Sequence, residues 1–171
     1  MRIERYDAER GALLPLFALA DDSPTQVALY VSLGEILVVR DGELIVGHAQ
    51  IVESSMPGEF ELKSLAVLEA RQGGGLGRDL VEAVLVRCRE RGGRRLIVST
   101  ATAAVGTLRF YQRQGFRMYR IVQDAFGPST GYPDGLLLDG IPLRDQVWLE
   151  LDLGRRGRSL TTGADSVPFM P

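Results

Sequence analysis

The sequence predicts a mixed α/β fold, in which a central, largely antiparallel sheet of six to seven strands is flanked by about four helices. Short alternating or β-branched segments recur along the chain, and several are separated by only a tight turn. Between them lie segments whose apolar residues repeat at helical spacing. The length of 171 residues, with 45% hydrophobic and 25% charged residues, fits one compact domain.

Seven segments have the pattern of β-strands. They are residues 2–6, 35–40, 43–53, 59–67, 96–100, 116–123 and 146–153. The second and third are joined by Asp41 and Gly42, which suit the positive backbone angles of a tight hairpin. The long loop before the last strand, 124–145, is expected to hold a further hairpin at Asp139 and Gly140.

Four segments have the period of α-helices. They are residues 8–20, 24–33, 75–91 and 103–114. Pro15 is expected to kink or split the first helix. Ser23 before Pro24 is a start signal for the second helix, which should stop at Gly34. The third helix carries an apolar stripe on which Cys88 is expected to be a buried, unreactive thiol.

Residues 1–153 are predicted to form a single domain. The remaining segment, 154–171, combines three arginines with a short apolar end and has the composition of coil. We expect a tail that docks on another surface, and a homodimer in which it docks on the partner subunit is one arrangement compatible with that expectation.

The bulk composition limits the classes of function. With 20 basic and 22 acidic residues the formal charge is -2, which favours neither nucleic acid nor an anionic membrane surface. One cysteine excludes an intramolecular disulfide, and the single histidine, His48, is expected to be packed or solvent-facing, so no metal site is predicted. The polar start of the chain and the lack of a long apolar run predict a cytoplasmic protein without a membrane span.

A glycine-rich segment lies between the fourth strand and the third helix. Glycines let successive backbone N–H groups converge, and the helix dipole adds positive potential, so an anion such as a diphosphate is favoured there. The phosphate-loop pattern fails because Arg78 follows Gly77, and the dinucleotide pattern fails because Arg78 replaces its third glycine. Arg71 and Arg78 are expected to add charge-assisted hydrogen bonds. A glycine-rich loop without a ligand is the alternative.

The spacing of Gln72, Gly75 and Gly77 resembles the pyrophosphate-binding motif of GNAT acetyltransferases, which has Gln or Arg, two residues, Gly, one residue, and Gly or Ala. The strand before it and residues 110–116, Phe-Tyr-Gln-Arg-Gln-Gly-Phe, resemble the family as well. The resemblance covers residues 35–123. It implies a GNAT-like fold and an acyl-CoA-dependent N-acetyltransferase, in which an amine attacks acetyl-CoA directly in a ternary complex.

The resemblance also implies how the donor is held. The pantetheine arm would lie along the end of the fourth strand and the diphosphate in the loop, with the Leu65 N–H as the oxyanion donor. The implied donor residues are Leu65, Ala66, Val67, Gln72, Gly73, Gly74, Gly75, Leu76, Gly77 and Arg78. The asparagine that often precedes the family's tyrosine is missing here, and Ser99 and Thr102 are the candidates to replace it.

Two residues are implied for proton transfer. Tyr111 occupies the position of the family's general acid, a role that suits a phenol because it stays protonated near neutral pH. Glu61 occupies the position of a general base, and strict strand alternation places it on one face with Leu65. Core packing is the competing interpretation for Tyr111, and an exposed ion pair for Glu61. Glu59 and Asp124 are alternative bases.

The acceptor is predicted only in outline, as a primary amine of a small molecule bound near the N-terminal helices and the loop 124–145. Side chains proposed to line its site are Asp21, Asp22, Glu53, Glu59, Asp124, Asp134, Tyr30, Tyr119 and Tyr132. Two other functions stay open, an acetyltransferase for protein N-termini or lysines and a non-catalytic acyl-CoA-binding regulatory module. Trp148 is expected to be a core residue.

Overall fold

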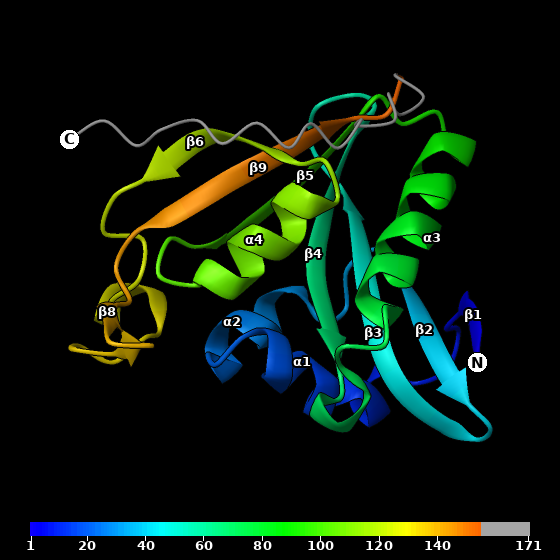
Figure 1. Cartoon of the computed structure of the whole chain (residues 1–171), viewed down its shortest axis with the longest axis horizontal. Helices are drawn as coiled ribbons and strands as arrows, with labels where there is room; N and C mark the ends of the chain where they lie inside the picture. Colours follow the sequence, from blue (N-terminus) through cyan, green and yellow to red (C-terminus); the bar gives the residue numbers. More distant parts are fainter. Residues whose placement is uncertain (155–171) are drawn as a thin grey trace, which may run out of the picture.

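The computed structural model describes residues 1–154, which form a curved seven-stranded sheet, a two-stranded hairpin and four α-helices (Figure 1). The strands are β1 (Arg2–Arg5), β2 (Glu35–Asp41), β3 (Leu44–Glu53), β4 (Glu59–Val67), β5 (Arg95–Ala101), β6 (Arg117–Val122), β7 (Leu137–Leu138), β8 (Ile141–Pro142) and β9 (Gln146–Asp152). The α-helices are α1 (Leu14–Ala20), α2 (Pro24–Tyr30), α3 (Leu76–Glu90) and α4 (Val105–Arg113). The predicted mixed α/β fold is confirmed, whereas the predicted tail after position 154 lies outside the described residues.

The sheet has the strand order β1-β2-β3-β4-β5-β9-β6, and its neighbours are antiparallel except for β4 and β5. The parallel pairing of β4 with β5 is short, because only Glu59, Phe60 and Glu61 pair, with Arg95, Leu96 and Ile97. Beyond that point the two strands diverge (Figure 1). The second half of β4 therefore has no ladder partner on its β5 side within residues 1–154.

Two helical layers cover the sheet. Helices α3 and α4 share one hydrophobic core with the inner residues of β2 to β5 and β9, and this core includes Leu80, Val84 and Tyr111. Helices α1 and α2 pack on the opposite face of β2 and β3, in a second core that includes Phe17 and Tyr30. The divergence of β4 and β5 thus lies between two separately packed helical layers.

Helix α1 begins one residue before Pro15, and the short 3-10 helix η1 (Arg10–Leu13) precedes it, so the predicted split at this proline is confirmed. Ser23 caps α2 as predicted, because its hydroxyl accepts from the Gln26 N–H at 3.3 Å. Helix α2 ends at Tyr30, three residues earlier than the sequence predicts.

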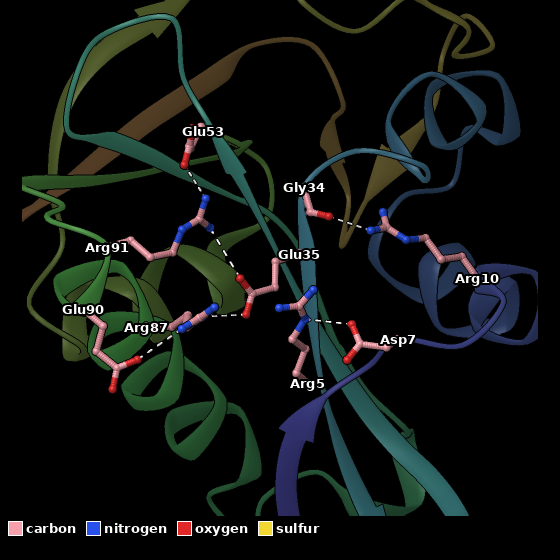
Figure 2. Close-up of polar contacts among 9 residues, drawn as sticks. All are labelled: Arg5, Asp7, Arg10, Gly34, Glu35, Glu53, Arg87, Glu90 and Arg91. Atoms are coloured by element: carbon pink, nitrogen blue, oxygen red, sulfur yellow. Dashed lines mark hydrogen bonds and ion pairs between the residues drawn. The ribbon is translucent and has the colours of Figure 1, made fainter.

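The early end of α2 is accompanied by side chains that bind the carbonyl groups at its end and just after it. Arg10 donates to the carbonyls of Val31 at 2.8 Å and Leu33 at 2.6 Å, and also to that of Gly34 (Figure 2). The buried Gln50 of β3 donates to the carbonyls of Tyr30 and Leu33. Two side chains distant in sequence therefore fix the end of α2 and the place of Tyr30.

An ion-pair network joins the end of α3 to β2 and β3 (Figure 2). Glu35, whose side chain is 10% exposed, pairs with Arg87 at 2.7 Å and with Arg91 at 3.5 Å. Arg91 also pairs with Glu53, and Glu90 pairs with Arg87. Hydrogen bonding to Glu35 raises the pKa of Arg87, so the guanidinium stays charged over the usual pH range.

The predicted hairpins are confirmed. Gly42 has φ of +60° between β2 and β3, and Asp139 and Gly140 have φ of +52° and +79° between β7 and β8. The β7–β8 hairpin lies apart from the main sheet, beyond the ends of β6 and β9 (Figure 1). Among residues 1–154, no helix combines the length and apolar character needed to cross a membrane.

Candidate active site

Strand β4 carries a bulge that changes which of its side chains share a face. Its pairing with β3 runs from Gln50 opposite Ser64 to Ile51 opposite Leu62, which leaves Lys63 as an extra residue. Before the bulge, Leu62 faces the α3 core, and beyond it Leu65 packs against the same core. Leu62 and Leu65, which are three residues apart, can face the same core only because the bulge interrupts the alternation of side chains along the strand.

The prediction that Glu61 and Leu65 share a face is therefore wrong. Glu61 contacts Lys63, and Lys63 lies over the ring of Tyr30, which belongs to the core under α1 and α2. Leu65 packs on the opposite side of the sheet, under α3. Strict alternation missed this because the bulge arises from the register with β3, which the sequence of β4 does not reveal.

The backbone of β4 after the bulge is open toward β5. The N–H of Leu68 donates to the Val46 carbonyl on β3, so strand alternation directs the N–H groups of Leu65 and Val67 away from β3. Ladder pairing with β5 has already ended at Glu61. The predicted pantetheine segment, which also includes Ala66, thus offers main-chain groups at the point where the sheet opens.

The glycine-rich loop joins this open edge to the N-terminus of α3. Gly73 and Gly75 have φ of +79° and +87°, a left-handed backbone that glycine adopts without strain. The first intrahelical bond of α3 runs from the Asp79 N–H to the Gly75 carbonyl, so the N–H groups of Leu76, Gly77 and Arg78 have no intrahelical partner. These donors and the helix dipole favour an anion at this position.

The side chains around the loop divide into two groups. Gln72 folds back and donates to the Val67 carbonyl at 3.0 Å, which holds the loop against the end of β4. Arg71 pairs with Asp41 of the β2–β3 hairpin at 2.6 Å, so its charge is already engaged. Arg78 is more exposed and contacts its neighbour Asp79 at the longer distance of 3.3 Å. Of the two arginines predicted to bind the diphosphate, Arg78 is the better placed.

Gly77 has a packing reason as well as a place in the motif. A Cβ at Gly77 would lie 3.3 Å from the ring of Phe110 on α4. A Cβ at Gly74 would lie 3.9 Å from the carbonyl oxygen of Arg71, which is an ordinary contact within the loop. The second motif glycine therefore permits α3 and α4 to pack closely beside the open edge of β4.

Tyr111 is buried on α4, with its ring packed edge-on against Phe110 and Phe116 at centroid distances of 5.2 and 5.5 Å. Burial raises the pKa of its phenol well above the usual range. A neutral hydroxyl is therefore maintained at every physiological pH. The two interpretations of Tyr111 drawn from the sequence, core packing and proton donation, are compatible in this arrangement.

The three carboxylates predicted as bases have different surroundings. Glu61 is half-buried on β4 and pairs with Lys63, whose Nζ lies 3.1 Å from Glu61 Oε1. Glu59 is bound by Arg95 at 3.0 Å and by the Ser54 hydroxyl at 2.7 Å. Asp124 is exposed and pairs with Arg144. Within residues 1–154, Glu61 is the one of the three that lies near the opening of the sheet without an arginine partner.

A polar chain leads from β3 and β4 to the N-terminal helices. His48 is buried with Nε2 2.8 Å from the Ser64 hydroxyl, and burial lowers its pKa to about 4. Ser64 in turn interacts with the phenol of Tyr30, which donates to Asp21 at 3.3 Å. Tyr132 donates to the other oxygen of Asp21 at 2.8 Å. His48 is packed, as one of its two sequence interpretations expected.

Side-chain hydrogen bonds also join the loop after β6 to the start of α2. The Ser23 hydroxyl and the Gln26 amide donate to the carbonyls of Gly131 and Thr130 at 3.1 and 2.8 Å. With the bond between Tyr132 and Asp21, these contacts bring together the two segments that the sequence proposed as the acceptor site. No local pattern signals these contacts, because the partners lie about a hundred residues apart along the chain.

The other predicted site residues are dispersed. Glu53 pairs with Arg91 at the far end of α3, and Tyr119, on β6, lies under the guanidinium of Arg95. The residues proposed for the acceptor therefore do not share one pocket in the described chain. Ser99 accepts from Gln146, and Thr102 donates to the Asp145 carbonyl, so both candidate replacements for the missing asparagine have partners in the structure.

Two predicted core residues differ in burial. Cys88 is fully buried, and burial raises the pKa of its thiol to about 12. Trp148 is only half-buried, with its indole N–H bound to Gln146 at 2.9 Å. Across the described part of the chain, no cluster of three or more His, Cys, Asp or Glu side chains could hold a metal ion.

Comparison with known proteins agrees with this geometry. The sequence model of the Acetyltransferase (GNAT) family matches residues 7–116. The uncharacterized N-acetyltransferase YvbK of Bacillus subtilis (strain 168) is 30% identical over 153 residues, which are 90% of this chain and 97% of that protein. These matches define an acetyltransferase that uses acetyl-CoA. The chain belongs to the GNAT family of N-acetyltransferases.

Solved structures extend the comparison. A Bacillus subtilis acetyltransferase in complex with CoA has a TM-score of 0.80 at 30% identity, and the match covers 88% of this chain and 97% of that one. An IAA acetyltransferase from Bacillus cereus ATCC 14579 has a TM-score of 0.79 at 32% identity, with 88% and 98% covered. A GNAT family acetyltransferase from Elizabethkingia anophelis with acetyl-CoA bound has a TM-score of 0.80 at 26% identity, with 88% and 97% covered.

Proposed function

We propose that this protein transfers the acetyl group of acetyl-CoA to a primary amine of a small molecule, by direct attack of the amine within a ternary complex. One observation carries the proposal. The edge of β4 that faces β5 has no ladder partner at Leu65 to Val67, and it continues directly into the glycine-rich loop and the N–H groups without intrahelical partners at the start of α3. This arrangement suits a donor that has an extended amide-containing arm and a diphosphate.

Each part of the open edge of β4 and of the glycine-rich loop has a proposed role in holding the donor. The amide groups of the pantetheine arm pair with the main chain of β4, and the Leu65 N–H stabilises the negative charge that develops on the thioester oxygen. The diphosphate binds at the loop from Gln72 to Arg78, through backbone N–H groups and the Arg78 guanidinium. Two relatives with TM-scores of 0.80 have CoA or acetyl-CoA bound, which supports acetyl-CoA as the donor.

Proton transfer requires a base on one side of the reacting carbonyl and an acid on the other. An alkylamine has a reference pKa of about 10, so it must lose a proton before it attacks. Glu61 lies on the α1 and α2 face and is proposed to accept that proton, directly or through water. Tyr111 lies on the α4 side with a neutral phenol and is proposed to protonate the departing thiolate. Base and acid thus approach the opening from opposite faces of the sheet.

The acceptor side favours a small molecule over an extended peptide. Residues 21–26, at the start of α2, and residues 130–132 are joined by three side-chain hydrogen bonds, which close this side of the fold with side chains rather than with a free strand edge. A peptide substrate would be expected to add as a strand to an open edge. The open edge of β4 is assigned to the donor, so a peptide could not pair with it at the same time.

The decisive experiment measures thiol release from acetyl-CoA in the presence of a panel of acceptors, together with calorimetry of CoA binding. The panel contains small primary amines, peptides with free N-termini or lysines, and IAA, because the Bacillus cereus relative is an IAA acetyltransferase. We expect CoA binding and thiol release with a small amine. Release with peptides alone would favour a protein acetyltransferase, and binding without any turnover would favour a regulatory module.

A further inference from the structure

Lys63 stands out because it is the single lysine of the chain. Of the 20 basic residues, Lys63 is the lysine and all others are arginines. Its Nζ lies 3.1 Å from Glu61 Oε1 and 5.3 Å from the centroid of the Tyr30 ring. Arginine makes both kinds of contact at least as well as lysine, so neither contact accounts for a lysine in a chain otherwise restricted to arginine.

The chemical difference between the two side chains concerns proton loss. A lysine amine can pass its proton to a general base as it attacks and so act as a nucleophile, whereas a guanidinium stays protonated. Lys63 and Glu61 are both half-buried, with side-chain exposures of 30% and 18%. An amine and a carboxylate base are therefore already in contact, as nucleophilic acyl transfer requires.

The position of Lys63 brings this amine close to the proposed thioester. Lys63 is the bulged residue of β4 and lies two residues before Leu65, the proposed oxyanion donor. Two residues of a strand span about 6.6 Å, a distance that the four-carbon stem of lysine can bridge. Lys63 lies on the same face as Glu61 and contacts Tyr30, and this is the face assigned to the acceptor.

We infer that Lys63 is an acetylation site of the protein itself, modified by its own bound acetyl-CoA when no acceptor amine is present. This inference rests on the proposed function. Glu61 takes a proton from the Lys63 ammonium, the freed Nζ attacks the thioester carbonyl, and a new C–N amide bond forms as the C–S bond breaks. The thiolate of CoA leaves with the bonding electron pair and takes up a proton from Tyr111. The attacking nitrogen loses its second proton through water to the Tyr111 phenolate, so that the amide and the phenol are both neutral at the end and Glu61 carries the remaining proton. Acetylation removes the positive charge of Lys63 and with it the ion pair to Glu61.

The test uses the full chain, acetyl-CoA and no added amine, followed by trypsin digestion and mass spectrometry. Trypsin cleaves after Lys63 only when its side chain is free, so acetylation replaces the peptides 41–63 and 64–71 by a single acetylated peptide 41–71. We expect this peptide to accumulate together with a single turnover of thiol release. In the Lys63→Arg variant, that release should be absent.

Controls separate self-acetylation from background chemistry. The variant Arg120→Lys introduces an exposed lysine on the edge strand β6, and we expect position 120 to remain unmodified while Lys63 is acetylated. In Glu61→Gln, acetylation of Lys63 should slow by about tenfold or more, because the base is removed. The Arg120→Lys variant unfolded in urea should lose the selectivity for Lys63 over position 120.

The outcomes distinguish this inference from the proposed function. Acetyl transfer to a small amine without any modification of Lys63 would overturn the inference and leave the function intact. Equal acetylation at positions 63 and 120, or a rate unchanged in Glu61→Gln, would also overturn it, because background chemistry would then account for the product. A protein that binds no CoA would overturn both.

Discussion

The backbone of Gly34 lies directly against the carbonyl group of Ile51, so that a Cβ on Gly34 would overlap with the Ile51 oxygen. Gly34 has φ of +58° and connects α2 to β2, immediately after the carbonyls that Arg10 and Gln50 bind. The glycine is therefore required by space as well as by backbone conformation, and it keeps α2 close to the sheet.

Replacing Gly34 by alanine should cost at least about 3 kcal/mol in free energy of unfolding, because backbone atoms of β3 would have to move. Gly42 provides a matched control, since its φ of +60° is nearly the same and a Cβ there would meet nothing within 4 Å. Gly42→Ala should cost only about 1 kcal/mol, from backbone strain alone. Urea unfolding of both variants measures the difference, and equal costs would contradict the role of the Ile51 contact.

Glu35 should contribute more to stability than the more exposed members of its ion-pair network. Glu35→Gln leaves Arg87 and Arg91 without their shared partner, whereas Glu90→Gln removes a single contact of a side chain that is 59% exposed (Figure 2). We expect a clearly lower urea midpoint for Glu35→Gln than for Glu90→Gln. Similar midpoints would mean that the network does not anchor α3.

Stability should fall in mildly acidic solution because of His48. Its pKa of about 4 in the folded protein lies below the reference value of 6.5, so between these values the unfolded chain binds the proton and the folded chain does not. The resulting contribution to the free energy of unfolding is complete above pH 6.5 and is lost as pH falls toward 4. At pH 5 the loss in unfolding free energy reaches about 2 kcal/mol.

The variant His48→Gln removes this titration and leaves the carboxylates unchanged. The difference in unfolding free energy between pH 7 and pH 5 should therefore be smaller for His48→Gln than for the wild type. Urea titrations at the two pH values measure it. An identical pH dependence in the two proteins would show that His48 does not titrate in this range.

Arg78 and Arg71 should differ in their effect on CoA binding. Arg78 is exposed at the start of α3 and can reach a diphosphate, so Arg78→Ala should raise the dissociation constant by about tenfold, as loss of a charge-assisted hydrogen bond does. Arg71 is engaged with Asp41, so Arg71→Ala should change it by no more than about twofold. Calorimetry with CoA tests both, and the reverse order would move the diphosphate to the Arg71 side of the loop.

Removal of the Tyr111 hydroxyl should slow turnover by about tenfold or more while CoA affinity stays the same, because general acids act on the leaving group and not on donor binding. Tyr119→Phe, on the exposed edge strand β6, serves as the control and should turn over at the wild-type rate. Steady-state kinetics and calorimetry measure the two quantities. Wild-type turnover in Tyr111→Phe would leave Tyr111 only its packing role.

Much of the fold follows from local patterns. Ser23 and Pro24 mark the start of α2, and Gly42 and Gly140 mark hairpins, because the residue itself sets the backbone conformation there. The motif around Gly75 is equally local, since the loop and the helix start lie next to each other in the chain. Such features need no knowledge of what packs against them.

Other features depend on partners that local patterns do not specify. Helix α2 ends early where Gln50 binds its last carbonyl and Arg10 binds the carbonyls that follow it. The register of β4 against β3 decides that Glu61 and Leu65 lie on opposite faces. The composition did contain one signal for the site, the single lysine among arginines, but its meaning depends on the contact with Glu61.

By itself, the sequence determined the mixed α/β class, the order of strands and helices, and the GNAT motif from Gln72 to Gly77, because each depends on residue spacing within one segment. Only the tertiary structure decided that β4 parts from β5 after Glu61 and that the bulge at Lys63 separates Glu61 from Leu65. The physical reason is that backbone pairing between strands sets which groups remain unpaired and which face each side chain occupies.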